Sequence, residues 1–320
     1  MNDNKPCIEL CGVKKYFKMR NGTLHAVDGI NVEIEEGTTL GVVGESGCGK
    51  STLGRVTLNL LPVTEGEVRF YGDKISQLSQ QKMVNYRKKM SLIFQDPYSS
   101  LDPRKTMADI VDEPLKIYKI CANKQERRDK VVELLRTVGL AERYSMSYAH
   151  ELDGGRRQRV GIARALAVDP KFIVCDEPVS ALDVSIQAQI LNLLMDLQQE
   201  RRLTYMFVTH NLSVVKHISD KIMVMYLGQC VEIAKSSELF SNPTHPYTKA
   251  LLAAIPLPTI KGPRLGSNVI RGELTSPIDP KPGCRFYARC PYASKMCVEQ
   301  DVRLKDIGGG HMVACTLCRD

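Results

Sequence analysis

The sequence predicts an α/β protein built on a doubly wound parallel sheet, with a helical insertion and a small cysteine-rich C-terminal extension. Short apolar runs typical of buried strands alternate with helical patterns along most of the chain, and this order produces such a sheet. A block over residues 97–160 is rich in lysine, arginine and glutamate and has a helical pattern, which indicates an insertion. After Ile255 prolines become frequent and cysteines follow, which indicates an extended linker and a loop-rich module.

The first third of the chain predicts strands joined by turns. The runs 8–13 and 29–34 alternate apolar and polar residues, and the turn signal Arg20-Asn21-Gly22 lies between them. Residues 39–43 form a continuous apolar run, which is typical of a buried parallel strand. A glycine-rich turn follows, and a helical pattern begins near Lys50 and ends at Pro62.

Strand and helix patterns return in the second half of the chain. Strands are predicted over residues 172–175, 205–209 and 221–226, and the clearest helix between them covers 186–200. We predict a large domain over residues 1–255, in which the helical subdomain covers about 97–160. The extension covers residues 256–320.

Composition limits the class of protein. The chain has 320 residues, of which 43% are hydrophobic and 25% charged, as in an ordinary globular protein. No run approaches the roughly 18–20 apolar residues of a spanning helix, and residues 1–6 lack the apolar segment of a signal peptide. The net charge of +8 fits an anionic ligand or the cytoplasmic membrane face, but charge alone does not decide between functions. We expect a cytosolic chain whose membrane role, if it has one, comes through partners.

The strongest motif is a glycine-rich loop between the apolar run 39–43 and the helix that begins at Lys50. It fits G-x-x-x-x-G-K-[ST] and consists of Gly44, Glu45, Ser46, Gly47, Cys48, Gly49, Lys50 and Ser51, with Thr52 next in the helix. Glycines let successive backbone amides face phosphate oxygens, and the helix directs its positive N-terminal end at the same anion. Lys50 is expected to reach the β- and γ-phosphates of ATP, and the Ser51 hydroxyl to help hold Mg²⁺.

A second apolar strand, over residues 172–175, ends in two adjacent acids, Asp176 and Glu177. We predict that Asp176 binds Mg²⁺ through water and that Glu177 polarises the attacking water as general base. Acids at strand ends are common, so this pair indicates ATP hydrolysis only together with the phosphate loop.

The segment 152–160 reads L-D-G-G-R-R-Q-R-V and resembles the L-S-G-G-Q signature of ABC ATPases with its R-Q-R-V continuation. The resemblance covers residues 7 to about 255 and implies a P-loop ABC nucleotide-binding domain with a mixed-sheet core and a helical insertion. Family members form head-to-tail dimers, which implies that Asp153, Gly154 and Gly155 face the ATP held by a partner subunit.

Further residues fall in the order of the same family. Gln95 resembles the Q-loop glutamine, which implies a role at Mg²⁺ and in catalysis, and residues 180–183 resemble the D-loop. His210 resembles the switch histidine, which implies a catalytic role. Phe17 resembles the aromatic residue that stacks on adenine, with its neighbour Tyr16 as the alternative.

Two stretches resemble oligopeptide and dipeptide importer subunits in particular: the Q-loop region 95–104 and the His-Pro-Tyr block 242–252. By this resemblance the chain is an F-type subunit that pairs with a D-type ATP-binding subunit under two membrane permease subunits. An extracytoplasmic peptide-binding protein would deliver the cargo. The chain would then lie peripherally on the cytoplasmic face of the cell membrane.

Alternative functions remain open from the sequence. Nickel and glutathione importers share these motifs, and a regulatory subunit with one degenerate ATP site would also carry an altered signature. A DNA-repair or chromosome-organising ATPase would contain long coiled-coil or zinc insertions between its motifs, and the sequence contains none. We therefore expect no nucleic-acid partner.

Five of the eleven cysteines lie close together at the C-terminal end: Cys284, Cys290, Cys297, Cys315 and Cys318. Disulfides are unusual in the cytosol, so the spacing favours a metal site. Structural zinc usually takes two tight cysteine pairs, and only Cys315 and Cys318 form one. Some related importer subunits carry a 4Fe-4S cluster in this extension. This resemblance and the wide spacing predict a cluster on Cys284, Cys290, Cys297 and Cys315, with Cys318 as a spare and zinc as the alternative.

The signature departs from the family at Asp153, where the family has serine, and at Arg156, where it has glutamine. A carboxylate about 4 Å from a phosphate oxygen is repelled by roughly 4 kcal/mol per charge pair at an effective dielectric near 20. Arg156 and the helix dipole offset part of this repulsion. We predict an asymmetric pair of sites, in which the site capped by Asp153 hydrolyses ATP slowly or only holds it. In the alternative, Asp153 turns away or binds Mg²⁺, and both sites work.

Overall fold

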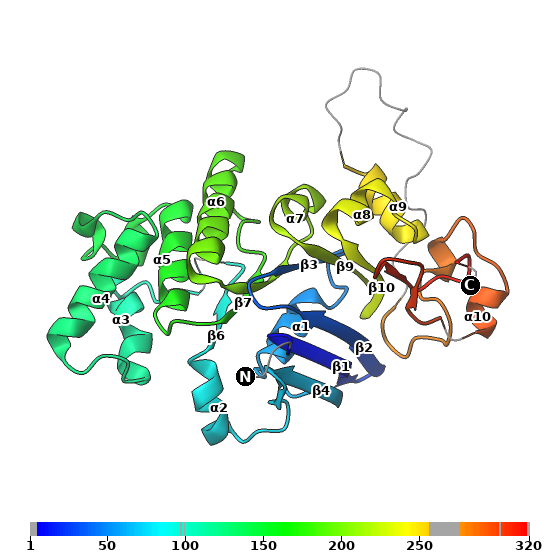
Figure 1. Ribbon diagram of the computed structural model, residues 1–320, viewed down its shortest axis with the longest axis horizontal. Coiled ribbons are helices and arrows are strands. Elements are labelled where there is room, and N and C mark those ends of the chain that lie inside the picture. Colours follow the sequence, from blue (N-terminus) through cyan, green and yellow to red (C-terminus); the bar gives the residue numbers. More distant parts are fainter. Residues whose placement is uncertain (1–4, 97, 99, 256–275, 301, 319–320) are drawn as a thin grey trace, which may run out of the picture. The chain divides into compact units, whose positions relative to one another are not determined.

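The computed structural model describes residues 5–96, 98, 100–255, 276–300 and 302–318, and it divides into two compact units (Figure 1). The first unit contains residues 77–207, the short segment 34–38 and the N-terminal residues up to Cys7. The second contains residues 8–33, 39–76 and 208–320. The predicted proline-rich linker falls largely on residues 256–275, which lie outside the described residues. None of the described helices is long and apolar enough to cross a membrane.

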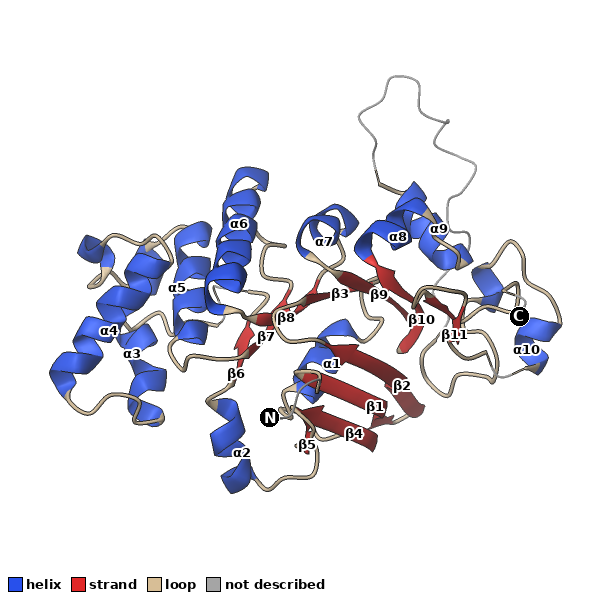
Figure 2. Cartoon of the chain, in the orientation of Figure 1, coloured by secondary structure: helices blue, strands red, loops and turns tan. Residues whose placement is uncertain are grey.

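The first unit combines a strand layer with a group of helices (Figure 2). Its strands lie in the order β8-β7-β6, and β6 pairs with β7 in parallel. The helices α3, α4 and α5 lie side by side in the region of the predicted helical block, and α5 continues beyond residue 160 (Figure 1). The bounds are α2 Gln80–Arg87, β6 Met90–Ile93, α3 Met107–Ile117, α4 Lys124–Thr137, α5 Gly154–Leu166, β7 Phe172–Asp176, α6 Val184–Arg201 and β8 Thr204–Val208.

Side-chain caps begin α3 and α4 of the first unit. The Thr106 hydroxyl accepts a hydrogen bond of 3.2 Å from the Asp109 amide at the start of α3. The Asn123 side chain accepts one of 2.9 Å from the Glu126 amide at the start of α4. Caps of this kind satisfy amides that have no partner within the helix, so the local sequence decides where these two helices begin.

The second unit contains two sheets. The first is antiparallel, with strand order β2-β1-β4-β5, and the second has the order β11-β12-β10-β9-β3. The bounds are β1 Ile8–Met19, β2 Gly22–Ile34, β3 Thr39–Val43, α1 Lys50–Thr57, β4 Glu65–Phe70, β5 Asp73–Lys74, α7 Leu212–Ile218, β9 Lys221–Tyr226, β10 Gln229–Lys235, α8 Ser236–Ser241, α9 Pro246–Ala253, α10 Met296–Glu299, β11 Lys305–Asp306 and β12 Met312–Val313.

The wholly parallel sheet predicted from the alternation of elements is wrong for this unit, and the mixed-sheet core implied by the resemblance is confirmed. β3 and β9 pair in parallel, whereas β9 with β10 and β10 with β12 pair antiparallel. Only Leu227 and Gly228 separate β9 from β10, and both have positive φ values, 44° and 84°. A two-residue turn leaves the chain no room to cross over, so the second strand must return antiparallel.

The core of the second unit joins residues that are distant in the sequence. Val43 of β3, Tyr226 of β9, Tyr247 of α9 and Phe286 of the extension are all buried in one cluster. The Tyr226 and Phe286 rings pack edge to face with their centroids 5.2 Å apart. The described part of the extension therefore shares its core with the strand that leads into the phosphate loop.

Candidate functional site

The phosphate loop connects β3 to α1, as predicted. Gly49 has φ 103°, and a Cβ atom there would lie 1.9 Å from the Ala26 carbonyl oxygen, so only glycine fits this position. The Lys50 side chain is buried, and its ammonium donates to the carbonyls of Gly44 at 2.9 Å and Glu45 at 3.0 Å. Ser51 and Thr52 stand in the first turn of α1. The loop thus holds a cation beside a helix N-terminus, where phosphate binds.

Glu45 is held from two sides by residues of the C-terminal part of the chain. Its amide donates to the Tyr247 hydroxyl at 2.9 Å. Its carboxylate receives two hydrogen bonds from the Arg289 guanidinium, at 2.7 and 3.1 Å. The loop motif indicates the place of Glu45, but its partners lie 202 and 244 residues further along the chain and are not indicated by the motif. The only local signal for Arg289 is its position next to Cys290.

The aromatic pair near the start of the chain lies on β1. The Tyr16 hydroxyl donates to the Asp28 carboxylate, and its ring stacks on His25 with centroids 3.9 Å apart. Burial raises the pKa of Asp28. The hydrogen bond from Tyr16 and the charge of Arg285 lower it by more than burial raises it, so the pKa of Asp28 lies below its usual value. The Lys15 ammonium lies over the Phe17 ring, 5.0 Å from the ring centroid. Tyr16 is thus engaged within the unit by its contacts with Asp28 and His25.

The two predicted acids lie at the end of β7 in the first unit. Asp176 is buried, and Glu177 follows with φ 47°, a strained value for a residue with a side chain. The Gln95 amide donates to the Glu177 carboxylate at 3.2 Å, so the predicted Q-loop glutamine and general base are adjacent. His210 is exposed and belongs, like Lys50, to the second unit.

The signature begins α5. Asp153 is its N-cap and accepts a hydrogen bond of 2.8 Å from the Arg156 amide. The Arg156 guanidinium lies 3.3 Å from the second carboxylate oxygen of Asp153. A Cβ atom on Gly155 would lie 2.7 Å from the Ile186 side chain, and one on Gly154 would lie 3.1 Å from that of Leu182. Both glycines therefore permit close packing between the signature and the chain around the start of α6.

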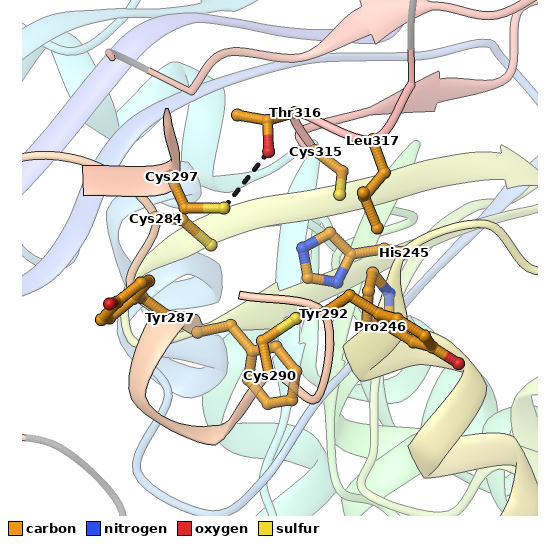
Figure 3. A pocket seen from close by; sticks show the side chains of 11 residues that line it. His245, Pro246, Cys284, Tyr287, Cys290, Tyr292, Cys297, Cys315, Thr316 and Leu317 are labelled. Atoms are coloured by element: carbon orange, nitrogen blue, oxygen red, sulfur yellow. Dashed lines mark hydrogen bonds between the residues drawn. The ribbon is translucent and has the colours of Figure 1, made fainter. Parts of the chain in front are cut away.

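Four of the five C-terminal cysteines line one pocket with His245, Pro246 and Phe286: Cys284, Cys290, Cys297 and Cys315. Figure 3 shows their sulfur atoms facing a common space. Cys318 is not among the residues that line this pocket. Among the described residues, no group of three or more His, Cys, Asp or Glu side chains is placed to hold a metal ion. The structure thus places the four predicted cysteines around one pocket, and the predicted metal site itself stays a prediction.

The thiols of this pocket have different environments. Burial raises the pKa of Cys284 to about 11 and also raises those of Cys290 and Cys315. Burial acts in the same direction on Cys297, but hydrogen bonds involving Thr316 and Ser294 outweigh it, so the pKa of Cys297 lies below its usual value. The Thr316 contact, between Oγ1 and the Cys297 sulfur, is 3.2 Å long (Figure 3).

A buried carboxylate fastens the His-Pro-Tyr block to the extension. Glu232 of β10 is fully buried and accepts hydrogen bonds from the amides of Thr244 at 2.8 Å and His245 at 3.0 Å. One of its oxygens also lies 2.7 Å from Nε2 of His311, beside β12. Each buried carboxylate oxygen therefore has a partner, as a charge in the interior requires.

Comparisons with known proteins agree with this geometry. Residues 27–180 match the ABC transporter family, and residues 231–297 match the C-terminal region of oligopeptide/dipeptide transporters. The chain is 49% identical to the oligopeptide transport ATP-binding protein AppF of Bacillus subtilis, over 97% of both chains. It is 45% identical to the dipeptide transport ATP-binding protein DppF of Haemophilus influenzae, over 98% of both chains.

Among solved structures, the ATP-binding cassette MJ0796, in a dimeric post-hydrolysis state bound to ADP and Pi, superposes with a TM-score of 0.66. It shares 33% identity, and the match covers 72% of this chain and 98% of that one. The fold, the phosphate loop and these matches define an ATPase of the ATP-binding cassette class. Within that class, the chain belongs to the family of oligopeptide and dipeptide transport ATP-binding proteins.

Proposed function

We propose that this chain is the ATP-hydrolysing subunit of an ABC importer that takes up oligopeptides or dipeptides across the cytoplasmic membrane. The observation that carries the proposal is the phosphate loop with buried Lys50, in a chain whose relatives of nearly equal length are named as peptide transport ATP-binding proteins. The match of residues 231–297 to the peptide transporter C-terminal region favours a peptide cargo over nickel or glutathione.

The proposed chemistry divides into binding and hydrolysis. Lys50 neutralises the β- and γ-phosphates, and Ser51, Gln95 and Asp176 hold Mg²⁺ directly or through water. Glu177 polarises the attacking water, and its hydrogen bond from Gln95 fixes the direction of the carboxylate.

Two further residues complete the proposed nucleotide site. His210 contacts the γ-phosphate and reports its loss after hydrolysis. Phe17 stacks on the adenine ring.

The experiment that tests hydrolysis uses the assembled transporter with one change at a time. Glu177→Gln should leave ATP binding intact and lower the turnover number by about a hundredfold or more, because the general base is lost. Lys50→Ala should weaken nucleotide binding itself, which a fluorescent ATP analogue would report. Near-normal peptide uptake by the Glu177→Gln transporter would overturn the assignment.

The partners in the proposal are a D-type ATP-binding subunit, two permease subunits and an extracytoplasmic peptide-binding protein. The dimeric state of the cassette MJ0796 supports pairing between two nucleotide-binding subunits. The chain would sit peripherally on the cytoplasmic face of the membrane through the permeases. Co-purification of the tagged chain with the D-type subunit and permeases, without nucleic acid, is the expected result.

We further propose that Cys284, Cys290, Cys297 and Cys315 hold a 4Fe-4S cluster. Their common pocket supports this, and their wide spacing in the sequence suits a cluster better than zinc, which usually takes two tight cysteine pairs. Such a cluster would cross-link the segments of the extension as a structural clamp.

Anaerobic purification should give a brown protein with about four iron and four sulfide per chain. Cys297→Ser should lose the colour, and Cys121→Ser, a cysteine of the first unit, should keep it. A colourless protein with one equivalent of zinc would contradict the proposal.

A further inference from the structure

Two arginines stand next to cysteines of the pocket in the sequence, as Cys284-Arg285 and Arg289-Cys290. Both side chains are buried, with 6% of Arg285 and 7% of Arg289 exposed. Buried guanidinium groups require carboxylate or carbonyl partners. Those partners lie in the segments that surround the phosphate loop rather than in the extension.

Arg289 contacts the phosphate loop directly. Its two terminal nitrogens donate to the two oxygens of Glu45, at 2.7 and 3.1 Å, in the planar two-point geometry that makes arginine–carboxylate pairs strong. Nη1 also lies 3.3 Å from the Tyr226 hydroxyl. Glu45 is coupled in turn to the lysine, because its carbonyl accepts a hydrogen bond of 3.0 Å from the Lys50 ammonium.

Arg285 contacts β2 and the turn between β9 and β10. Its guanidinium donates hydrogen bonds to the Asp28 carboxylate and to the Leu227 carbonyl. The Asp28 carboxylate also accepts a hydrogen bond from the Tyr16 hydroxyl. Gly228, the residue after Leu227, donates its amide to the Cys48 carbonyl at 2.8 Å. One arginine therefore links the cysteine segment both to the strand that carries Phe17 and to the turn that supports the phosphate loop.

We propose that Arg289 and Arg285 are positioning residues for ATP, through which the cysteine-lined segment sets the affinity of the phosphate loop. This inference rests on the proposed function, in which ATP binds at Lys50. The Glu45 carboxylate belongs to a loop that must accept a polyanion, and an unpaired carboxylate there would repel the phosphates. Arg289 neutralises this charge by pairing with both carboxylate oxygens. The cysteine segment carries Arg289, so displacement of that segment frees the carboxylate.

The test compares assembled transporters that carry Arg289→Gln, Glu45→Gln or both changes. Arg289→Gln should raise the KM for ATP about tenfold, as expected for loss of a charged hydrogen-bond pair, and change kcat by less than about threefold. The double variant should recover an ATP KM close to that of the unchanged protein, because the unpaired charge is gone. Arg289→Lys should give an ATP KM between those of the unchanged protein and Arg289→Gln, because lysine keeps the charge but not the two-point geometry.

A matched control separates this role from general stabilisation. Arg69 lies in the same unit and pairs with Glu67 and Glu9 away from the loop, so Arg69→Gln should leave the ATP KM unchanged. An unchanged KM in Arg289→Gln, or a double variant as impaired as the single one, would overturn the inference.

Lys50→Ala distinguishes a failure of the positioning role of Arg289 from a failure of the proposed nucleotide site. If it abolishes ATP binding while Arg289→Gln does nothing, only the positioning role fails. If ATP binding survives Lys50→Ala, the proposed nucleotide site fails.

The contribution of the cysteine segment has its own measurement. Cys290→Ser should raise the ATP KM to a similar extent as Arg289→Gln, and the combination should be no worse than either alone, because both changes release Glu45. Additive effects of the two changes would show that the cysteine acts by another route. An unchanged ATP KM in Cys290→Ser would show that the cysteine segment does not control the loop.

Discussion

Both carboxylate oxygens of Asp153 interact with Arg156 of α5, the helix that Asp153 caps. One accepts the Arg156 amide at 2.8 Å as an N-cap, and the other lies 3.3 Å from the Arg156 guanidinium. The side chain remains 59% exposed, so solvent and Arg156 both reduce its effect on a nearby phosphate. The repulsion expected at this position is therefore smaller than for an unpaired carboxylate, but a carboxylate still lacks the proton that serine donates.

We retain the prediction of two unequal ATP sites. Asp153→Ser should raise the ATPase rate of the transporter, because it removes the charge and supplies a donor, while serine keeps the N-cap and the stability of α5. Changing the base glutamate to glutamine in one subunit at a time provides the second measurement. Greater loss with Glu177→Gln in this chain than with the equivalent change in its partner is expected. Equal losses would contradict the asymmetry.

At the scale of elements, α9 is fixed by an unusual cap. His245 is 1% exposed, and its Nδ1 accepts a hydrogen bond of 3.1 Å from the Tyr247 amide. Burial lowers the pKa of His245 to about 4. The ring is therefore neutral at pH 7, as an acceptor must be, and Pro246 begins the helix where no amide donor is needed.

This cap predicts a loss of stability in acid. Above pH 6.5 neither the folded nor the unfolded chain protonates His245, so its contribution is complete. Between pH 6.5 and about 4 only the unfolded chain takes up the proton, so the free energy of unfolding falls by about 3 kcal/mol as the pH falls. Urea denaturation of the full-length chain at several pH values measures this. His245→Asn keeps an acceptor without a titrating group and should show a shallower decrease; equal slopes would exclude His245 as the cause.

The element predictions succeeded where the pattern is local and continuous. The apolar runs became β3 and β9 at the expected residues, and the loop at Lys50 begins α1. The run 8–13 was too short, because β1 continues to Met19 with half-buried and exposed residues that lack clear alternation. The short strands β5, β11 and β12 have two residues each, too few to produce a periodic signal.

At the scale of the whole molecule, the described part of the extension is built into the second unit. The Ala314 amide donates to the Val231 carbonyl at 2.9 Å, and β12 pairs with β10. Glu232 joins β10, the His-Pro-Tyr block and His311 through buried hydrogen bonds. The extension thus shares both its core and a buried polar network with the strands of the phosphate-loop unit.

Removing the carboxylate at this junction should loosen the extension. Glu232→Ala leaves two buried amides and His311 without their acceptor and should lower the free energy of unfolding by about 3 kcal/mol. Glu232→Gln retains one acceptor oxygen and should cost less. Hydrogen exchange of residues 302–318 provides the local measurement, with Glu67→Ala, a half-buried acid on β4 of the same unit, as the control. Unchanged protection in Glu232→Ala would exclude this role.

The sequence by itself determined the parts whose chemistry lies in consecutive residues: the phosphate loop at Lys50, the acids at the end of β7 and the signature that begins α5. In each of these motifs, the order of consecutive residues sets the local backbone conformation and the position of a helix or strand end. Both depend only on residues that are close together in the sequence. Only the tertiary structure decided that Arg289 pairs with Glu45, 244 residues away, and Arg285 with Asp28, 257 residues away. The antiparallel course of β10 was decided in the same way. These contacts depend on the path of the folded chain, and the charge of a side chain alone does not specify which distant residues meet.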